Sequence, residues 1–284
     1  MTYRELCQCL QNGNIENAEW DAACLLEHCC NTDPLSLRLN PEKDYDSPSL
    51  TDAVHRRLAR EPLQYIIGEW QFYRQTYEVS PDCLIPRSDT EILVEEAIRL
   101  LPHGARFADL CTGSGCSAIS ILAERSDTCA VALEKFPNTL SLAMRNAQKN
   151  GVGERFTPLL ANVLEAPPTA LIAPPLHAIV SNPPYIATRE LDALSPEVHA
   201  EPQAALDGGD DGLLFYRAIL EHYEECLTPD GFFLFEIGYD QKDALLSLAR
   251  EHGFAHTHVI RDLGGNDRVV YLSKNIPYER KKLI

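Results

Sequence analysis

From residue 107 onward, short apolar runs alternate with longer amphipathic segments, and this alternation restricts the possible folds more than any other feature of the chain. Short apolar runs predict buried strands, and the segments between them have the spacing of helices. We predict strands at 107–110, 129–133, 155–160, 176–182, 231–237, 256–261 and 268–273, and helices at 116–124, 137–150, 211–227 and 240–252. Such alternation indicates an α/β fold, a parallel sheet with helices on both faces. No helix separates the last two strands, which predicts an antiparallel edge pair.

The first 62 residues have a helical pattern throughout, interrupted by glycine and proline, which predicts a bundle of three to five helices. An alternating segment at 72–79 then predicts a short hairpin that joins two domains. We predict a helical domain at 1–72, a linker hairpin at 73–88 and a second domain at 89–284. Nothing in the bundle is typical of catalysis, so it is either a docking module or a stabilising cap.

Composition limits the function classes. The 284 residues carry a net charge of −17, which opposes non-specific binding to nucleic acid or to an anionic membrane. No stretch of 18 apolar residues and no signal-like amino-terminal segment occurs, so we expect a cytoplasmic protein. The 10 cysteines include no Cys-x-x-Cys pair, so we expect no metal site and buried thiols in a reducing compartment.

A strand, a glycine turn and a helix follow one another at 107–124, with the turn at Cys111–Gly115. Glycines let the backbone approach a ligand, and the helix start presents unpaired N–H groups. The next strand ends in Glu134, 19 residues after Gly115, where a carboxylate can accept hydrogen bonds from both hydroxyls of a ribose. The turn alone could be a structural loop, but with Glu134 it predicts a nucleotide-like cofactor. No phosphate-binding loop of the ATP-binding type occurs.

The apolar run at 178–180 ends in Ser181-Asn182-Pro183-Pro184-Tyr185. The prolines have fixed φ angles and lack N–H groups, so they hold the neighbouring carbonyls in a rigid array. The Asn182 oxygen and the Pro183 carbonyl could accept the two hydrogens of a flat group that carries an NH2, while Tyr185 stacks on its plane. The alternative is an ordinary loop that begins with Asn-Pro-Pro.

Ser88 and Glu91 have the spacing of a capping box, which predicts a helix that runs to Leu101. A helix start accounts for these two residues. It does not account for Pro86 and Arg87, which we therefore consider as candidate site residues.

Taken together, these motifs resemble the HemK/PrmC-type protein-(glutamine-N5) methyltransferases, which modify peptide chain release factors. The resemblance rests on EPLQYI at 61–66, LIPRSDTE at 84–91, DLCTGSG at 109–115, NPPYI at 182–186, EP at 201–202, ALDGGDDGL at 205–213 and DRVV at 267–270. It implies a seven-stranded Rossmann-like sheet of the class I methyltransferases, preceded by a helical domain that binds the release factor. The NPPY motif alone would also admit DNA adenine methyltransferases.

The resemblance also implies the cofactor, S-adenosylmethionine, with S-adenosylhomocysteine as its product, and the residues that bind it. The implied cofactor-binding residues are Asp109, Cys111, Thr112, Gly113, Ser114, Gly115, Glu134, Asn162, Val163 and Asn182. The implied substrate-binding residues are Asn182, Pro183, Pro184, Tyr185, Phe72, Pro86 and Arg87, of which Asn182, Pro183 and Tyr185 are also expected to be catalytic. The family usually has Gly in place of Cys111 and often Asp in place of Asn162.

We therefore expect methyl transfer from S-adenosylmethionine to the side-chain amide N5 of the glutamine in the Gly-Gly-Gln (GGQ) motif of release factors, a step connected with translation termination. Three alternatives stay open: methylation of a ribosomal-protein glutamine, methylation of adenine N6 in nucleic acid, and a non-catalytic adaptor that keeps the fold. The acidic charge argues against the second, and the complete NPPY motif argues against the third.

Overall fold

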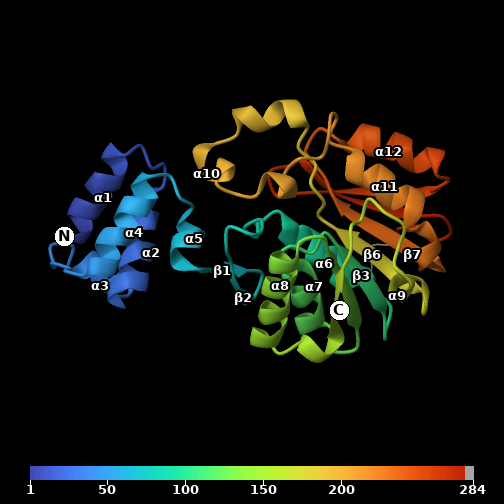
Figure 1. The fold of residues 1–284 in the computed structure, drawn as a ribbon, viewed down its shortest axis with the longest axis horizontal. Helices are drawn as coiled ribbons and strands as arrows, with labels where there is room; N and C mark the ends of the chain where they lie inside the picture. Colours follow the sequence, from blue (N-terminus) through green and yellow to red (C-terminus); the bar gives the residue numbers. More distant parts are fainter. Residues whose placement is uncertain (279–284) are drawn as a thin grey trace. The chain divides into compact units, whose positions relative to one another are not determined.

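The chain forms two compact units, drawn in sequence colours in Figure 1. The computed structural model describes residues 1–278, so the last six residues of the predicted second domain lie outside the described part. The first unit, here called the helical unit, consists of Met1–Glu69 together with Ser195–Ala200. The second, here called the sheet unit, begins at Trp70 and contains the rest of the chain.

Short helices build the helical unit, as the sequence predicts. They are α1 (Tyr3–Asn12), α2 (Ala18–Cys30), α3 (Pro34–Leu39), α4 (Pro48–Leu58), α5 (Leu63–Ile67) and, from the later segment, α10 (Pro196–His199). A capping box formed by Thr2 and Glu5 starts α1. Leu6, Leu25 and Leu26 are fully buried, so these short helices are stabilised mainly by packing of their apolar faces.

A seven-stranded sheet forms the centre of the sheet unit, in the order β5-β4-β3-β6-β7-β9-β8. Its strands are β3 (Arg106–Leu110), β4 (Cys129–Glu134), β5 (Phe156–Leu160), β6 (Leu176–Ser181), β7 (Leu227–Glu236), β8 (His256–Arg261) and β9 (Asp267–Ser273). Strands β3 to β7 pair in parallel, while β9 is antiparallel to both β7 and β8. The predicted α/β class, the parallel sheet and the antiparallel edge pair are confirmed.

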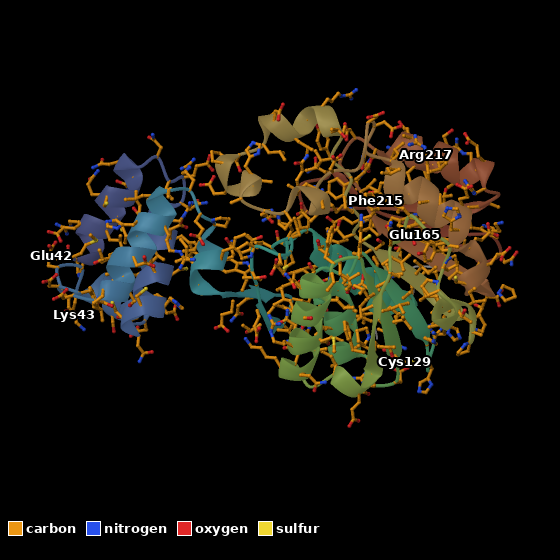
Figure 2. All side chains as sticks on the ribbon, in the orientation of Figure 1. Glu42, Lys43, Cys129, Glu165, Phe215 and Arg217 are labelled. Atoms are coloured by element: carbon orange, nitrogen blue, oxygen red, sulfur yellow. The ribbon has the colours of Figure 1, made fainter. Side chains whose placement is uncertain are left out.

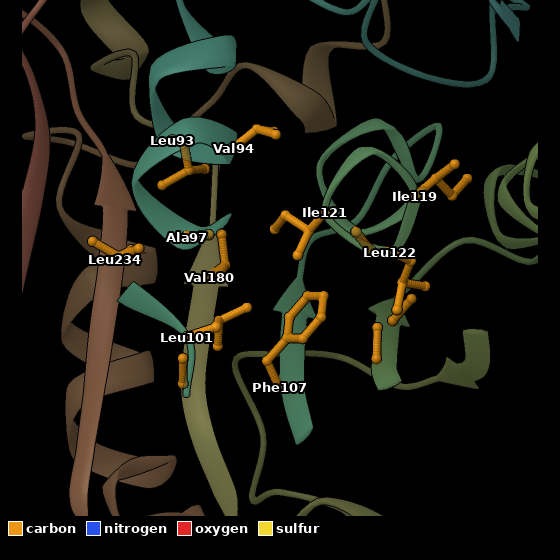
Figure 3. Close-up of a cluster of buried hydrophobic side chains, with 14 of the residues drawn as sticks. Leu93, Val94, Ala97, Leu101, Phe107, Ile119, Ile121, Leu122, Val180 and Leu234 are labelled. Carbon is orange, nitrogen blue, oxygen red and sulfur yellow. The ribbon is translucent and has the colours of Figure 1, made fainter. Parts of the chain in front are cut away.

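Helices cover both faces of the sheet (Figure 1). They are α6 (Thr90–Leu100), α7 (Cys116–Glu124), α8 (Pro137–Lys149), α9 (Thr169–Ile172), α11 (Leu214–His222) and α12 (Lys242–Glu251). Consecutive strand residues point to opposite faces. Phe107 therefore packs with α6 and α7 in the cluster of Figure 3, whereas Ala108 belongs to the cluster under α9, α11 and α12.

The predicted hairpin consists of β1 (Glu69–Phe72) and β2 (Gln75–Glu78). Asn146 of α8 is fully buried and connects this hairpin to the glycine turn, because its amide donates to the carbonyls of Glu78 (3.0 Å) and Ser114 (2.9 Å). The hairpin is thereby connected to one side of the predicted cofactor site.

The predicted capping box at Ser88 is wrong. Helix α6 starts at Thr90 with Asp89 at its N-cap, and no side chain caps it. The Glu91 carboxylate instead accepts a hydrogen bond of 2.9 Å from the backbone N–H of Tyr73. A long-range contact with the hairpin thus replaces the local cap that the spacing predicted.

The polar strand ends meet at one edge of the sheet. Strand order reverses between β3 and β6, and ligands of open α/β sheets bind at the carboxyl ends of strands at such a point. The glycine turn follows β3, Glu134 ends β4, and Asn182 follows β6. Of the helices formed by residues 1–278, none has the length and apolar character needed to cross a bilayer.

Candidate active site

A cavity of about 300 Å³ lies at these carboxyl ends. It brings together twelve of the predicted site residues: Pro86, Arg87, Asp109, Cys111, Thr112, Gly113, Ser114, Glu134, Asn162, Val163, Asn182 and Pro184. Phe215, which is labelled in Figure 2, contributes to the lining from the first turn of α11. The size is typical of a pocket for a small organic ligand.

The glycine turn has the backbone geometry that its sequence predicts. Cys111, Gly113 and Gly115 have φ angles of 61°, 55° and 82°, in the left-handed region that favours glycine. A Cβ at Gly115 would lie 2.7 Å from Cδ1 of Ile119, so a side chain there would force the Ile119 side chain to move. Cys111 thus occupies strained backbone, in a conformation that glycine would adopt without strain.

The buried Asp109 side chain stabilises this turn through hydrogen bonds. Its carboxylate accepts from the Thr112 hydroxyl (2.7 Å) and from the backbone N–H of Ala118 (3.2 Å). Burial raises the pKa of the Asp109 carboxyl to about 7, against the lowering effect of these two hydrogen bonds. The geometry indicates that Asp109 orders the turn in addition to lining the cavity.

The Glu134 carboxylate is oriented by three backbone amides. Its Oε2 accepts from Gly113 (3.1 Å), and its Oε1 accepts from Lys135 (2.8 Å) and Phe136 (3.1 Å). The side chain is 7% exposed, and burial raises its pKa while the amides act in the opposite direction. Three of the roughly four acceptor sites of the carboxylate are thereby occupied, and the remaining one, on Oε2, can accept from a ligand hydroxyl.

Asn162 and Val163 form another part of the wall. The Asn162 oxygen accepts from the backbone N–H of Leu164 (3.2 Å), and its NH2 group donates to Glu165 (3.1 Å). Val163 is 2% exposed and belongs to the apolar cluster. The Asn162 oxygen is therefore already engaged once, and only its second lone pair is available to a ligand.

Asn182 occupies the lip of the cavity with a fixed side chain. Its Nδ2 donates to the Thr90 hydroxyl at 3.1 Å, and both residues line the cavity. Pro183 and Pro184 are buried, and of these two only Pro184 reaches the lining. Pro183 thus provides a rigid backbone behind the lip.

Tyr185 is held through its backbone and not through its ring. The side-chain amide of Gln241 donates to the Tyr185 carbonyl at 2.8 Å. A Cβ at Gly208 would lie 2.8 Å from the Tyr185 Cα, and one at Gly212 would lie 2.3 Å from its carbonyl oxygen, so both positions require glycine. The Tyr185 ring packs against the apolar cluster and does not line the cavity, so its stacking role stays a prediction.

Arg87 and Pro86 reach the cavity, whereas Phe72 does not. Arg87 forms an ion pair with the buried Glu201, whose other oxygen accepts from the backbone N–H of Ile85 at 3.0 Å. Phe72 is 2% exposed and packs edge-on against Tyr77 in the core. The structure therefore does not bring Phe72 to the site, because its ring fills the space between the hairpin and the sheet helices.

Comparison with known proteins identifies the family. A family model described as the PrmC N-terminal domain matches residues 2–68. The release factor glutamine methyltransferase of Geobacter sulfurreducens is 40% identical over 265 residues, which cover 92% of this chain and 91% of that protein. This chain belongs to the release factor glutamine methyltransferase family. The family member of Caulobacter vibrioides is 34% identical over 272 residues, with 94% and 93% of the two chains covered.

The fold is also found outside the release factor glutamine methyltransferase family. The hMettl16 catalytic domain, solved in complex with MAT2A 3'UTR hairpin 1, matches with a TM-score of 0.55 and 14% identity. The match covers 80% of this chain and 79% of that chain. At this identity the likeness concerns the fold alone.

Four residues that line the cavity or support its lining were not predicted from the sequence: Thr90, which lines it, and Glu201, Gln241 and Glu236, which lie behind it. Thr90 and Glu201 lie inside motifs that carry the family resemblance, so a signal for them was present. Gln241 and Glu236 lie outside those motifs. Their proximity to the NPPY segment arises from the sheet order, which places β7 beside β6.

Proposed function

We propose that this protein transfers a methyl group from S-adenosylmethionine to the side-chain amide nitrogen of the glutamine in the GGQ motif of peptide chain release factors. The single observation that carries the proposal is the shared cavity. It joins an oriented carboxylate, Glu134, to an oriented amide, Asn182, in a member of this family.

The polar and apolar groups that line the cavity suit the parts of S-adenosylmethionine. Glu134 would hold the ribose hydroxyls, the turn at Cys111–Gly115 would surround the methionine end, and Val163 would pack against the adenine. When bound, the cofactor supplies an electrophilic methyl group. A carboxylate held by three amides keeps one position, so little reorganisation is needed on binding.

The chemical difficulty lies in the substrate, because the lone pair of an amide nitrogen is delocalised into its carbonyl. Rotation about such a bond costs about 18–20 kcal/mol, which measures this delocalisation. If the Asn182 oxygen and the Pro183 carbonyl each accept one amide hydrogen, they raise the electron density on nitrogen and orient its lone pair. They also stabilise the positive charge that develops there during transfer.

Asn182 has the support that this role requires. Its NH2 group is engaged by Thr90, which leaves its oxygen for the substrate amide. The Pro183 carbonyl accepts no hydrogen bond from any of residues 1–278. Fixed acceptors on a proline-stiffened turn provide orientation before the substrate arrives, and orientation lowers the entropic cost of reaction.

For the helical unit we propose a docking role. It would bind the release factor away from the glutamine and raise the local concentration of the GGQ loop at the cavity. Residues 2–68, which match the PrmC N-terminal domain, make up nearly all of the unit to which this role is assigned.

The decisive experiment is mass spectrometry of a release factor incubated with this protein and S-adenosylmethionine, with fragmentation to locate the modified residue. The proposal expects one methyl group on the GGQ glutamine. Absence of that methyl, with S-adenosylhomocysteine binding intact by calorimetry, would overturn the substrate assignment. Ribosomal proteins and adenine-containing nucleic acid would then be the next substrates to test.

A further inference from the structure

Glu236 is a buried carboxyl beside the candidate active site that the proposed reaction does not use. It ends β7, is 1% exposed, and follows Phe235, which pairs with Ser181 of β6. Asn182 follows Ser181 as Glu236 follows Phe235, so the parallel register places Glu236 and Asn182 side by side. One carboxyl oxygen, Oε2, has no hydrogen-bond partner within residues 1–278.

Two polar side chains, Thr90 and Asn182, lie between the Glu236 carboxyl and the lip of the cavity. Asn182 Nδ2 donates to Thr90 Oγ1 at 3.1 Å. A hydroxyl that accepts in this way still has its own hydrogen to donate. The Thr90 and Asn182 side chains lie beside the Glu236 carboxyl and favour its ionised form. An ionised carboxylate can only accept, so it favours the arrangement in which Thr90 and Asn182 direct hydrogens, and not lone pairs, toward it.

We propose that ionised Glu236 is a positioning residue that fixes the side-chain amide of Asn182 with its NH2 group toward Thr90 and its oxygen available to the substrate. The inference rests on the proposed function, in which that oxygen accepts a hydrogen from the substrate amide. Glu236 itself touches neither substrate nor cofactor, since it does not line the cavity.

The reversed orientation of the Asn182 amide shows what Glu236 prevents. A half-turn of the amide would place its oxygen against the Glu236 carboxylate and would direct its NH2 group at the NH2 group of the substrate. Two acceptors would then face each other in a buried environment, and so would two donors, and such contacts are costly. A protonated Glu236 could donate to the reversed oxygen, so protonation removes the preference between the two orientations.

The surroundings of Glu236 place this change of charge near neutral pH. The pKa of its carboxyl is raised to about 7, chiefly by burial and to a smaller extent by Asp89 at the start of α6. The Thr90 and Asn182 side chains and the Arg268 guanidinium of β9 act in the opposite direction. Arg268 is itself shared with Asp89 (3.1 Å) and Asp262 (3.3 Å), so its charge is only partly available to Glu236.

The Tyr185 phenol also faces this cluster, and burial raises its pKa, so it is neutral through this range. The ionisation of Glu236 is therefore the change that alters kcat in this pH range. Above about pH 7, Glu236 is ionised and the productive orientation of Asn182 is enforced; as pH falls through about 7, Glu236 is protonated and kcat falls.

The test compares kcat against pH for the wild-type chain and for Glu236→Gln. Wild type is expected to show an inflection near pH 7. Glu236→Gln is expected to lack it and to remain about tenfold below the wild-type plateau, because an amide can present either an acceptor or a donor to Thr90. The KM for S-adenosylmethionine is expected to be unchanged. Wild-type kcat and an unchanged inflection in Glu236→Gln would overturn the proposal.

A second pair of variants tests the same arrangement without altering the carboxyl. Thr90→Val removes the hydroxyl at nearly constant volume and is expected to lower kcat about tenfold, because the loss of its hydrogen bond leaves buried polar groups unpaired. Thr90→Ser restores the hydroxyl and is expected to restore most of the activity. Equal kcat in Thr90→Val and Thr90→Ser would contradict the proposal even if Glu236→Gln failed to fold.

A readout that needs no turnover separates this inference from the proposed function. In nitrogen-15-labelled protein, the side-chain NH2 resonance of Asn182 is expected to shift with a midpoint near pH 7 in wild type and to stay constant in Glu236→Gln. If wild type fails to methylate release factor, the proposed function fails and this titration alone decides the role of Glu236. An Asn182 resonance that is insensitive to pH in wild type would overturn it.

Discussion

The side-chain amide of Gln241 donates a hydrogen bond of 2.8 Å to the backbone carbonyl of Tyr185. The same NH2 group donates to Gly212 at 3.2 Å, and the Gln241 oxygen accepts from the backbone N–H of Gly238 at 2.9 Å. One side chain thus connects the NPPY segment, the glycine-rich segment that packs on it and the turn after β7. A residue outside the NPPY motif, Gln241, thus supports the lip of the cavity.

Gln241→Glu is expected to loosen this support. The carboxylate can still accept from Gly238 but cannot donate to Tyr185, whose carbonyl would then face a negative charge. We expect a loss of about 1–3 kcal/mol of stability and a several-fold fall in kcat/KM for the release factor. Thermal unfolding and steady-state kinetics measure both effects, with Gln241→Ala as the variant that removes the hydrogen bonds without the repulsion. An unchanged kcat/KM in Gln241→Glu would contradict a role in supporting the lip.

Glu134→Gln is expected to weaken cofactor binding by about tenfold to a hundredfold. Both carboxylate oxygens accept from backbone amides, so a Gln side chain must direct its NH2 group at a backbone N–H. Leaving such donors unpaired costs about 1–3 kcal/mol. Calorimetric titration with S-adenosylhomocysteine measures the change, and Glu221→Gln on the exposed face of α11 is the matched control. Equal affinity for S-adenosylhomocysteine in the two variants would contradict the assignment of Glu134 to the cofactor site.

Much of the fold, and the strand ends and glycine turn that form part of the site, could be predicted from the sequence because they depend on local patterns. The strand ends at Leu110, Glu134 and Ser181 follow from apolar runs, and parallel strands bring such ends together. The left-handed turn at Cys111–Gly115 follows from glycine. These features need only residues that are close in sequence.

The remainder depends on contacts between distant residues. Glu91 meets the hairpin instead of capping α6, and Phe72 enters the core although the motif context suggested a substrate contact. The supporting partners Glu201 and Gln241 lie 114 and 56 positions from the residues that they hold. Periodicity and spacing do not encode such pairs; only the tertiary arrangement does.

Arg57→Met is expected to destabilise the helical unit by about 3–5 kcal/mol. Arg57 donates to Asp21 at 2.7 Å with both side chains buried, and removing the cation leaves a buried carboxylate uncompensated. Urea unfolding followed by the fluorescence of Trp20, in a Trp70→Phe background, reports on this unit. The double variant with Asp21→Leu is expected to recover most of the loss. A single variant as stable as wild type would show that the pair contributes little.

Asn182→Ala is expected to lower kcat by at least about a hundredfold while S-adenosylhomocysteine affinity changes little. The variant removes an acceptor for the substrate amide, and loss of a preorganised group of this kind typically costs 10²–10³ in kcat. Single-turnover methylation of release factor measures the step directly. Asn182→Asp is the informative companion, because it keeps an acceptor but cannot donate to Thr90. Unchanged turnover in Asn182→Ala would exclude the assigned role.

A chain that begins at Glu69 tests the docking role of the helical unit. The start must leave β1 complete, because Phe72 belongs to the core of the sheet unit. This chain is expected to methylate a short GGQ peptide as fast as the full chain does, since the whole cavity lining lies between Asp82 and Phe215. Its KM for intact release factor is expected to rise by about tenfold to a hundredfold, because the second binding contact is lost. An equal loss of activity on peptide and protein would instead assign the helical unit a structural role.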